Sequence, residues 1–228
     1  MEWNNKYIYP KSTRSIVDGS RHYSVNEERL PSVTTILKAT ESEEKKASLQ
    51  AWKQRVGQKQ AEIITREASS RGSSMHEYLE KFLHGKLNLD LLGDNTKERM
   101  MADQIIDNGL RNKLDEIWGC EATLYYPGKY AGAADCVGVY ENKETIIDFK
   151  QSNKPKKDEW IEDYYLQCAA YALAHNTVHG SNITQAAILL CTKDNMFQRF
   201  LIDGDRLKDY QNKFLEKVEQ FYAQRRAN

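Results

Sequence analysis

Three strand-like segments joined by two tight turns are the feature that most constrains the fold of this chain. They are rich in Val, Ile, Thr and Tyr, which favour strands. Pro127-Gly128-Lys129 and Glu141-Asn142-Lys143 supply the turns between them. Connections this short predict hairpin pairing of the segments, which are residues 120–126, 130–140 and 144–150.

The rest of the second half continues this α/β pattern. A helix is predicted over residues 159–175, followed by strands over 186–191 and 196–202. An amphipathic helix over 205–226 ends the chain. The predicted order is therefore β-β-β-α-β-β-α, which suits a sheet covered by helices.

The first half is mainly helical. Residues 6–25 predict short strands around a turn at Asp18-Gly19-Ser20, and Ser32 is the expected N-cap of the next helix. Further helical periodicity, with breaks near Gly57 and Gly72, covers residues 41–85 and 96–118.

These elements predict an α/β (α+β) fold with a central mixed β-sheet flanked by helices. An N-terminal part, residues 1–118, would hold strands and a helical subdomain. Residues 119–228 would form the core, and both parts would belong to one compact unit.

The composition is that of a globular protein. The chain has 228 residues, enough for one sizeable domain, and no apolar stretch long enough to span a membrane. Its first residues resemble neither a signal peptide nor a transit peptide, so a cytoplasmic location is expected. The four cysteines are widely spaced without a CxxC pair, which predicts buried, reduced thiols and no zinc or iron–sulfur site.

The segment Ile146-Ile147-Asp148-Phe149-Lys150 carries the chemistry. Alternate strand side chains share a face, so Asp148 and Lys150 point one way and Phe149 the other. A hairpin would bring Asp135 beside Asp148, and two close carboxylates repel unless a cation lies between them. The two aspartates and the Phe149 carbonyl oxygen suit Mg²⁺ or Mn²⁺, one or two ions. Taken alone, however, an Asp-x-Lys pair is often a surface ion pair.

A longer pattern of three motifs points more specifically to hydrolysis. Gly-x-x-Asp at residues 132–135, Asp-x-Lys at 148–150 and Gln-x-x-x-Tyr at 167–171 resemble the signature of RecB-type PD-(D/E)XK nucleases. The resemblance implies a restriction-endonuclease-like core and phosphodiester hydrolysis. In it, Asp135, Asp148 and Lys150 are catalytic, and Gln167 and Tyr171 position the active site and contact the nucleic acid.

Two further metal ligands are implied by the same family. The segment Gly72-Ser73-Ser74-Met75-His76 resembles the helix that supplies a histidine ligand, so His76 is the ligand expected here. Glu121 corresponds to a carboxylate near the metal in some members, although an exposed acid at a strand start is an equal alternative. Trp160 and Tyr164 extend the helix face of Gln167, and Trp160 is interpreted as a core residue.

The segment Leu30-Pro31-Ser32-Val33-Thr34, followed by Trp52 and the His76 motif, narrows the resemblance to the mitochondrial genome maintenance exonucleases and their phage and bacterial relatives. It implies a DNA exonuclease preferring single strands with free ends, in replication, repair or recombination. In relatives the helical part helps to form a passage for the strand. Possible protein partners belong to replication or recombination, and a phage or bacterial source is favoured.

The helical part also supplies cations and aromatics for contact with a single strand, Trp52 and Arg71 among them, although these could equally be core aromatics and solvated charges. An endonuclease on the same core, for DNA or RNA, remains an alternative, and so does a non-catalytic nucleic-acid-binding protein. The candidates for DNA contact are Trp52, Arg71, Ser73, Lys150, Lys154, Gln167 and Tyr171.

Overall fold

The computed structural model describes residues 1–86 and 96–226. Its centre is a mixed six-stranded sheet with the strand order β1-β5-β6-β7-β8-β9. β5, β6 and β7 pair antiparallel through the predicted turns, β8 lies parallel to β7, and β9 is antiparallel to β8. The strands are Glu2–Trp3 (β1), Leu114–Tyr126 (β5), Tyr130–Tyr140 (β6), Lys143–Ser152 (β7), Gln185–Thr192 (β8) and Phe197–Asp203 (β9).

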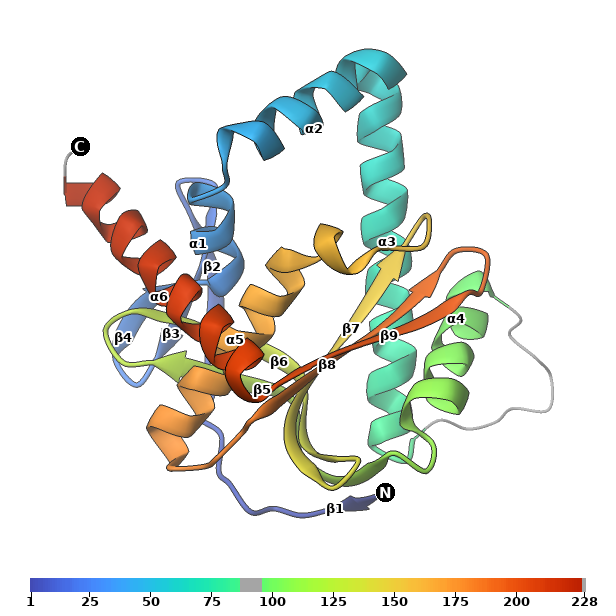
Figure 1. The fold of residues 1–228 in the computed structure, drawn as a ribbon, viewed down its shortest axis with the longest axis vertical. Helices are drawn as coiled ribbons and strands as arrows, with labels where there is room; N and C mark the ends of the chain where they lie inside the picture. Colours follow the sequence, from blue (N-terminus) through green and yellow to red (C-terminus); the bar gives the residue numbers. More distant parts are fainter. Residues whose placement is uncertain (87–95, 227–228) are drawn as a thin grey trace.

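Helices cover both faces of this sheet, which confirms the predicted architecture (Figure 1). β7 shows why, because Ile146 packs on one face while Ile147 and Phe149 pack on the other. Two separate apolar clusters result, each closed by its own helices. The helices are α1 (Val33–Ala39), α5 (Glu162–His179) and α6 (Gly204–Arg226) on the first face, and α3 (Gln58–Leu83) and α4 (Lys97–Ile105) on the second.

A small sheet precedes α1. It contains β2 (Thr13–Val17), β3 (Ser20–Val25) and β4 (Glu28–Pro31). The Ser32 hydroxyl accepts a hydrogen bond from the Thr35 backbone N–H at 3.0 Å, which confirms the predicted N-cap. This cap fixes the point where the chain turns from the small sheet into α1.

The helix α2 (Glu43–Val56) and the N-terminal part of α3 form an arm that stands away from the sheet (Figure 1). Gly57, with φ of 84°, makes the sharp corner between them, as predicted. The break expected near Gly72 is wrong, since α3 continues through it. The buried side chains of Met75, Leu79 and Leu83 hold this helix against the core, which outweighs a glycine cost of about 1 kcal/mol.

The helix predicted over residues 96–118 is also wrong beyond its first half. α4 runs into a π-helical turn at Ile106–Leu110, and β5 begins at Leu114. The boundary proposed after Trp118 therefore falls inside β5, and the division into two parts stays a prediction. Within the described residues, none of the helices is long and apolar enough to cross a lipid bilayer.

Candidate active site

One pocket of about 560 Å³ lies where α3, α5 and the small sheet meet β5, β6 and β7. Most of the predicted site residues line it, although they come from segments far apart in the sequence. The predicted residues that line the pocket are Ser73, His76, Glu121, Asp135, Phe149, Lys150, Gln167 and Tyr171.

Helical spacing explains how α3 reaches the pocket and the core at once. Ser69, Gly72, Ser73 and His76 follow an i, i+3, i+4, i+7 pattern, and all four line the pocket. The neighbouring stripe of buried apolar residues described above packs on the sheet. His76 is therefore held over the sheet by the packing of the same helix.

Three side chains form a candidate metal centre. One ligand atom each from His76, Glu121 and Asp135 lies within 4.8 Å of the other two. The His76 Nε2 lies 3.0 Å from the Phe149 carbonyl oxygen, and its Nδ1 lies 3.5 Å from Asp135 Oδ1. Carboxylate and carbonyl oxygens are ligands that Mg²⁺ and Mn²⁺ accept, and an imidazole nitrogen can complete such a set. These four groups are therefore the ones that would hold a divalent cation in this pocket.

The hairpin between β6 and β7 positions Asp135. Cys136 pairs with Ile147, so Asp135 lies level with the start of the Asp-x-Lys segment. Its Oδ2 accepts a hydrogen bond of 2.7 Å from the Phe149 backbone N–H. This bond fixes the carboxylate, and the Oδ1 atom faces His76.

Glu121 reaches the metal centre through an unusual backbone. It lies within β5 with φ of 49°, in the left-handed region that strands rarely contain. Although the residue stands at the exposed rim, neighbouring groups enclose its carboxylate. Burial and the charge of Asp135 raise the pKa of Glu121 to about 7, and His76 and Arg14 oppose this rise. A divalent cation would stabilise the charged form of this carboxylate.

Asp148 lies behind the pocket, where it contacts Lys150. Its side chain is only 2% exposed, and its Oδ2 lies 2.5 Å from the Lys150 Nζ. Burial holds the pKa of Asp148 above its usual range, and the Lys150 ammonium opposes this rise. Burial alone would lower the pKa of Lys150, but the carboxylates of Asp148 and Asp135 outweigh it and raise that pKa. The role of Asp148 as a metal ligand stays a prediction.

A chain of polar contacts leads from Asp148 to α5. Lys150 Nζ donates to Gln167 Oε1 at 3.2 Å, and Gln167 Nε2 donates to the Tyr171 hydroxyl at 3.3 Å. Lys150 also lies 5.1 Å from the centre of the Tyr164 ring. Gln167 and Tyr171 lie one helical turn apart, so Tyr171 can hold the Gln167 amide that orients Lys150.

Gly132 is required by the same packing. A Cβ atom there would lie 2.7 Å from the Tyr171 Cε1 and 2.8 Å from its hydroxyl oxygen. The ring of Tyr171 therefore occupies the space that any other residue at position 132 would need. At Gly72 the nearest atom to an added Cβ is Gln151 Cγ at 3.4 Å, an ordinary contact.

Three predicted DNA contacts lie outside the pocket lining. The Arg71 Nε donates to Gln151 Oε1 at 2.9 Å, and Arg71 also donates to Asn153, which ties α3 to the end of β7. Trp52 is half-buried on α2, and Lys154 is exposed beyond β7. Their contacts with DNA stay predictions.

The interpretation of Trp160 as a core residue is wrong. Its side chain is 60% exposed, and Lys157 Nζ lies 5.1 Å from the centre of its ring. The residue belongs to a 3₁₀ turn, Asp158–Trp160, and α5 begins only at Glu162. It therefore precedes the helix whose buried face it was expected to extend.

Sequence reasoning missed the contribution of the small sheet. Arg14, Arg21 and Tyr23 of this sheet line the pocket. Tyr164 of α5 also lines it, on the helix face expected from the sequence. The available signal was the alternation of Arg14 with Ile16 and of Arg21 with Tyr23 around the turn at Gly19. Such alternation places these side chains on one face of a hairpin.

The fold and the pocket define an α/β protein with a candidate metal centre beside a mixed sheet. No protein-family profile matches the chain. It is 30% identical to mitochondrial genome maintenance exonuclease 1 of Xenopus tropicalis over 210 residues, 84% of this chain and 57% of that protein. It is 27% identical to the Homo sapiens protein of the same name over 213 residues, 87% of this chain and 60% of that protein.

These proteins are homologues, and the resemblance to the mitochondrial genome maintenance exonucleases is confirmed. The chain spans less than two thirds of the length of either relative. Among solved structures, a candidate exonuclease of Eubacterium rectale matches 68% of this chain and 65% of its own, with 14% identity and a TM-score of 0.46.

Proposed function

We propose that the chain is a divalent-metal-dependent DNA exonuclease that acts on single strands with free ends. The observation that carries this proposal is the convergence of His76, Glu121, Asp135 and the Phe149 carbonyl in one pocket that also contains Lys150. Histidine, carboxylate and carbonyl ligands beside a lysine are the parts that phosphodiester hydrolysis needs.

Each part of the pocket has a role in this proposal. A bound Mg²⁺ or Mn²⁺ supplies Lewis-acid polarisation of the phosphate and lowers the pKa of attacking water. Asp135 and His76 hold their relative position through the Phe149 backbone, which contacts both. Lys150 is the cation that stabilises negative charge developing at phosphorus, and Asp148 and Gln167 orient it.

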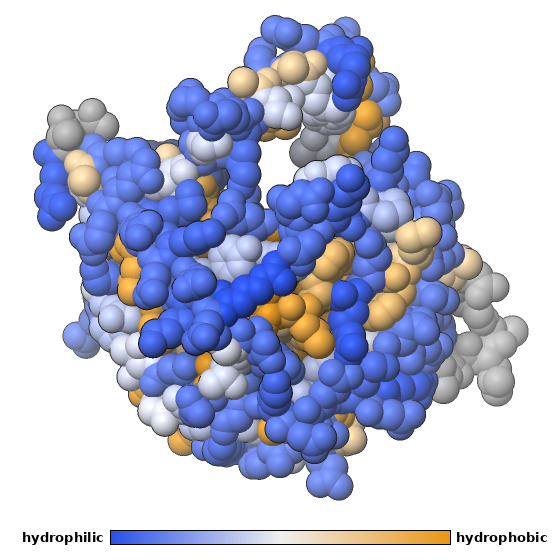
Figure 2. Space-filling view, viewed as in Figure 1, coloured by the Kyte–Doolittle hydropathy of each residue, from blue (hydrophilic) through white to orange (hydrophobic). Residues whose placement is uncertain are grey.

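The arm supports a single strand as substrate. Figure 2 shows an open gap between the outer end of the arm and the body of the molecule. At the inner side of the arm, Lys53 and Arg66 line a second cavity of about 560 Å³. Ser69 lines both this cavity and the active pocket, so the two spaces are neighbours. The resemblance of this chain to the mitochondrial genome maintenance exonucleases implies that the DNA strand is threaded past the arm.

The test is a panel of end-labelled DNA: single-stranded, double-stranded, flapped and circular, each with Mg²⁺ or Mn²⁺. We expect ladders or short products from linear single strands, an intact circle, and no cleavage in chelator. Asp135→Asn and Lys150→Met should each slow cleavage by about 10²–10³-fold. Lys208→Met, an exposed lysine on α6, is the matched control and should cleave normally.

An endonuclease on the same core is the alternative. Opening of the circular strand would favour it, because a circle has no end to thread. A matched RNA oligonucleotide extends the test to the sugar. Metal-independent binding without cleavage of any substrate would overturn the hydrolytic proposal and favour a binding protein.

A further inference from the structure

The small sheet carries two arginines at the rim of the active pocket, and one of them, Arg14, lies near enough to Glu121 to lower the pKa of that carboxyl. The chain balances 33 acidic and 33 basic residues, and many of its lysines and arginines form ion pairs. Arg14 and Arg21 are exposed, and among residues 1–86 and 96–226 neither side chain makes an ion pair or hydrogen bond with another residue. Both nevertheless line the active pocket.

Strand register places these two arginines on one face. Arg14 pairs with Tyr23, and Ile16 pairs with Arg21 across the β2–β3 hairpin. Directly paired residues share a face of a sheet. At one end of this face Tyr23 packs against Leu30 and Ala131. At the other end Ile16 is 67% exposed between the two arginines. We call Arg14, Ile16 and Arg21 the arginine face.

The arginine face continues into a second groove. Arg21 and Thr34 line both the active pocket and a cavity of about 470 Å³ over α1, which also contains Lys38. Among the described residues that line this cavity, none has an acidic side chain. The active pocket therefore has two neighbouring cavities, one that shares Ser69 on the side of the arm and one that shares Arg21 and Thr34 on the side of α1. Figure 1 shows α3 on one side of the molecule and β2 with α1 on the other.

We propose that the arginine face binds the part of the DNA strand that lies beyond the scissile phosphate, on the side away from the arm. Arg14 and Arg21 bind successive phosphates, Ile16 contacts a base, and Lys38 binds the next phosphate along the groove. Single-strand sites combine cationic grooves with surfaces that contact the bases, and arginine suits phosphate through its paired N–H donors. This inference rests on the proposed function, because it takes the strand to pass through the active pocket.

The test measures binding to a fluorescein-labelled oligothymidine by anisotropy, in chelator so that no cleavage occurs, across a range of salt concentrations. Each phosphate contact contributes about 0.7 to the slope of log affinity against log salt for a single strand. Arg14→Ala/Arg21→Ala should lower that slope by about 1.4 and weaken binding at low salt by at least about tenfold. Arg14→Lys/Arg21→Lys should keep most of the slope, because it keeps the charge.

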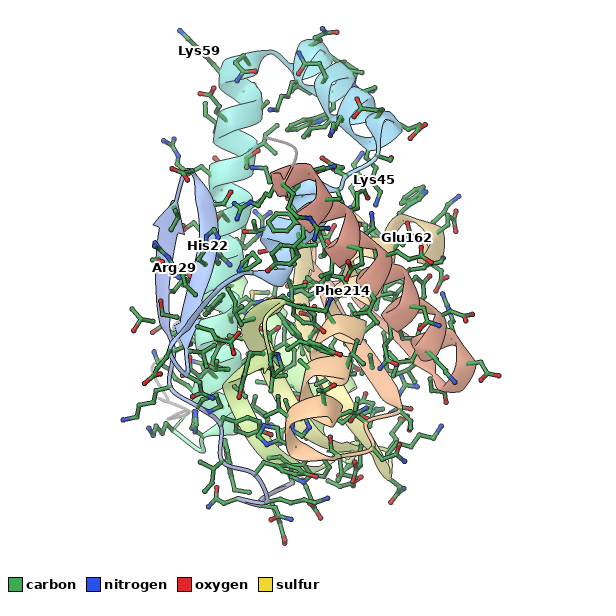
Figure 3. The ribbon with its side chains drawn as sticks, turned by 90° about the vertical axis from the view of Figure 1, so that its left-hand side faces the viewer. His22, Arg29, Lys45, Lys59, Glu162 and Phe214 are labelled. Carbon is green, nitrogen blue, oxygen red and sulfur yellow. The ribbon has the colours of Figure 1, made fainter. Side chains whose placement is uncertain are left out.

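Arg29 supplies the matched control. It is exposed on the same small sheet (Figure 3). It pairs with Ser24, so its side chain lies on the opposite face of that sheet from Arg21. Arg29→Ala should bind like the unmodified protein. An equal loss in Arg29→Ala and in the double variant would mean that only overall charge matters, and it would overturn the proposal. Circular dichroism confirms that the surface variants are folded.

A scan with single neutral methylphosphonates locates the contact. At the phosphate that Arg21 binds, the modification should weaken binding of the unmodified protein but not of Arg21→Ala. The proposal is overturned if the unmodified protein cleaves DNA while the double variant keeps its affinity and salt slope. If the unmodified protein binds DNA but never cleaves it, the proposed function fails, and the binding assay still decides the role of the arginine face.

Discussion

Replacing Glu121 tests whether the left-handed backbone within β5 stores strain at the candidate metal centre. The residue has φ of 49°, and only glycine adopts such a conformation without a steric penalty. Glu121→Ala and Glu121→Gly both remove the carboxylate. They differ only in the Cβ atom, so their comparison isolates the backbone from the ligand and from its repulsion by Asp135.

The expected difference follows from two opposing effects. A Cβ atom in the left-handed region costs roughly 1–2 kcal/mol in the folded state. Glycine loses more chain entropy on folding, which costs about 0.5–1 kcal/mol. Glu121→Gly should therefore exceed Glu121→Ala in free energy of unfolding by about 0.5–1 kcal/mol. For a chain of this size that is about 1–4 °C in melting temperature.

Urea and thermal unfolding in chelator measure this difference, and titration calorimetry with Mn²⁺ should show equally weakened binding in both variants. Thr123, two residues along β5 with φ outside the left-handed region, is the control. There the sign should reverse, with Thr123→Ala more stable than Thr123→Gly. The strain argument is refuted if Glu121→Ala is as stable as Glu121→Gly.

Four other substitutions test the site. Gly132→Ala should destabilise the fold by about 1–3 kcal/mol in urea unfolding, because Tyr171 must move; Gly72→Ala, within a helix, should instead gain about 0.5–1 kcal/mol. Lys150→Met should keep DNA affinity by anisotropy while losing cleavage, and a parallel loss of affinity would contradict its catalytic role. Burial raises the pKa of Asp148 from 3.8 in the unfolded chain to about 6 in the folded protein. The free energy of unfolding of the metal-free protein should therefore fall as the pH rises from about 4 to about 6. Asp148→Asn should flatten this part of the pH profile.

Much of the site could be predicted because strand geometry is regular. The alternation in β7 predicted that Asp148 and Lys150 share a face with Phe149 on the other, and the hairpin turns predicted that Asp135 would lie beside them. The helical spacing of Gln167 and Tyr171 was equally informative. Local periodicity determines each of these relations, so no knowledge of distant contacts was needed.

The start of β5 could not be predicted, because bulges imitate a helix. Its buried residues Leu114, Ile117 and Trp118 follow an i, i+3, i+4 spacing. Register shifts at Leu114/Glu116 and Ile117/Gly119 add residues to the strand and disturb its alternation. The arginine face was missed for another reason. Whether these side chains lie at the pocket depends on where the small sheet packs against the rest of the protein. No periodicity within residues 13–25 contains that information.

The continuity of α3 gives the arm a mechanical connection to the chemistry. Its 26 residues form a rod of about 39 Å that bears the outer corner at one end and is clamped in the core at the other. His76 lies at the start of the clamped part, directly after the buried Met75. Because α3 continues through Gly72 without a break, a force on its outer end would be transmitted along the helix to the packed turn that carries His76. In the proposed function, a pull on the DNA strand at the arm would therefore act on the helix turn of the proposed metal ligand.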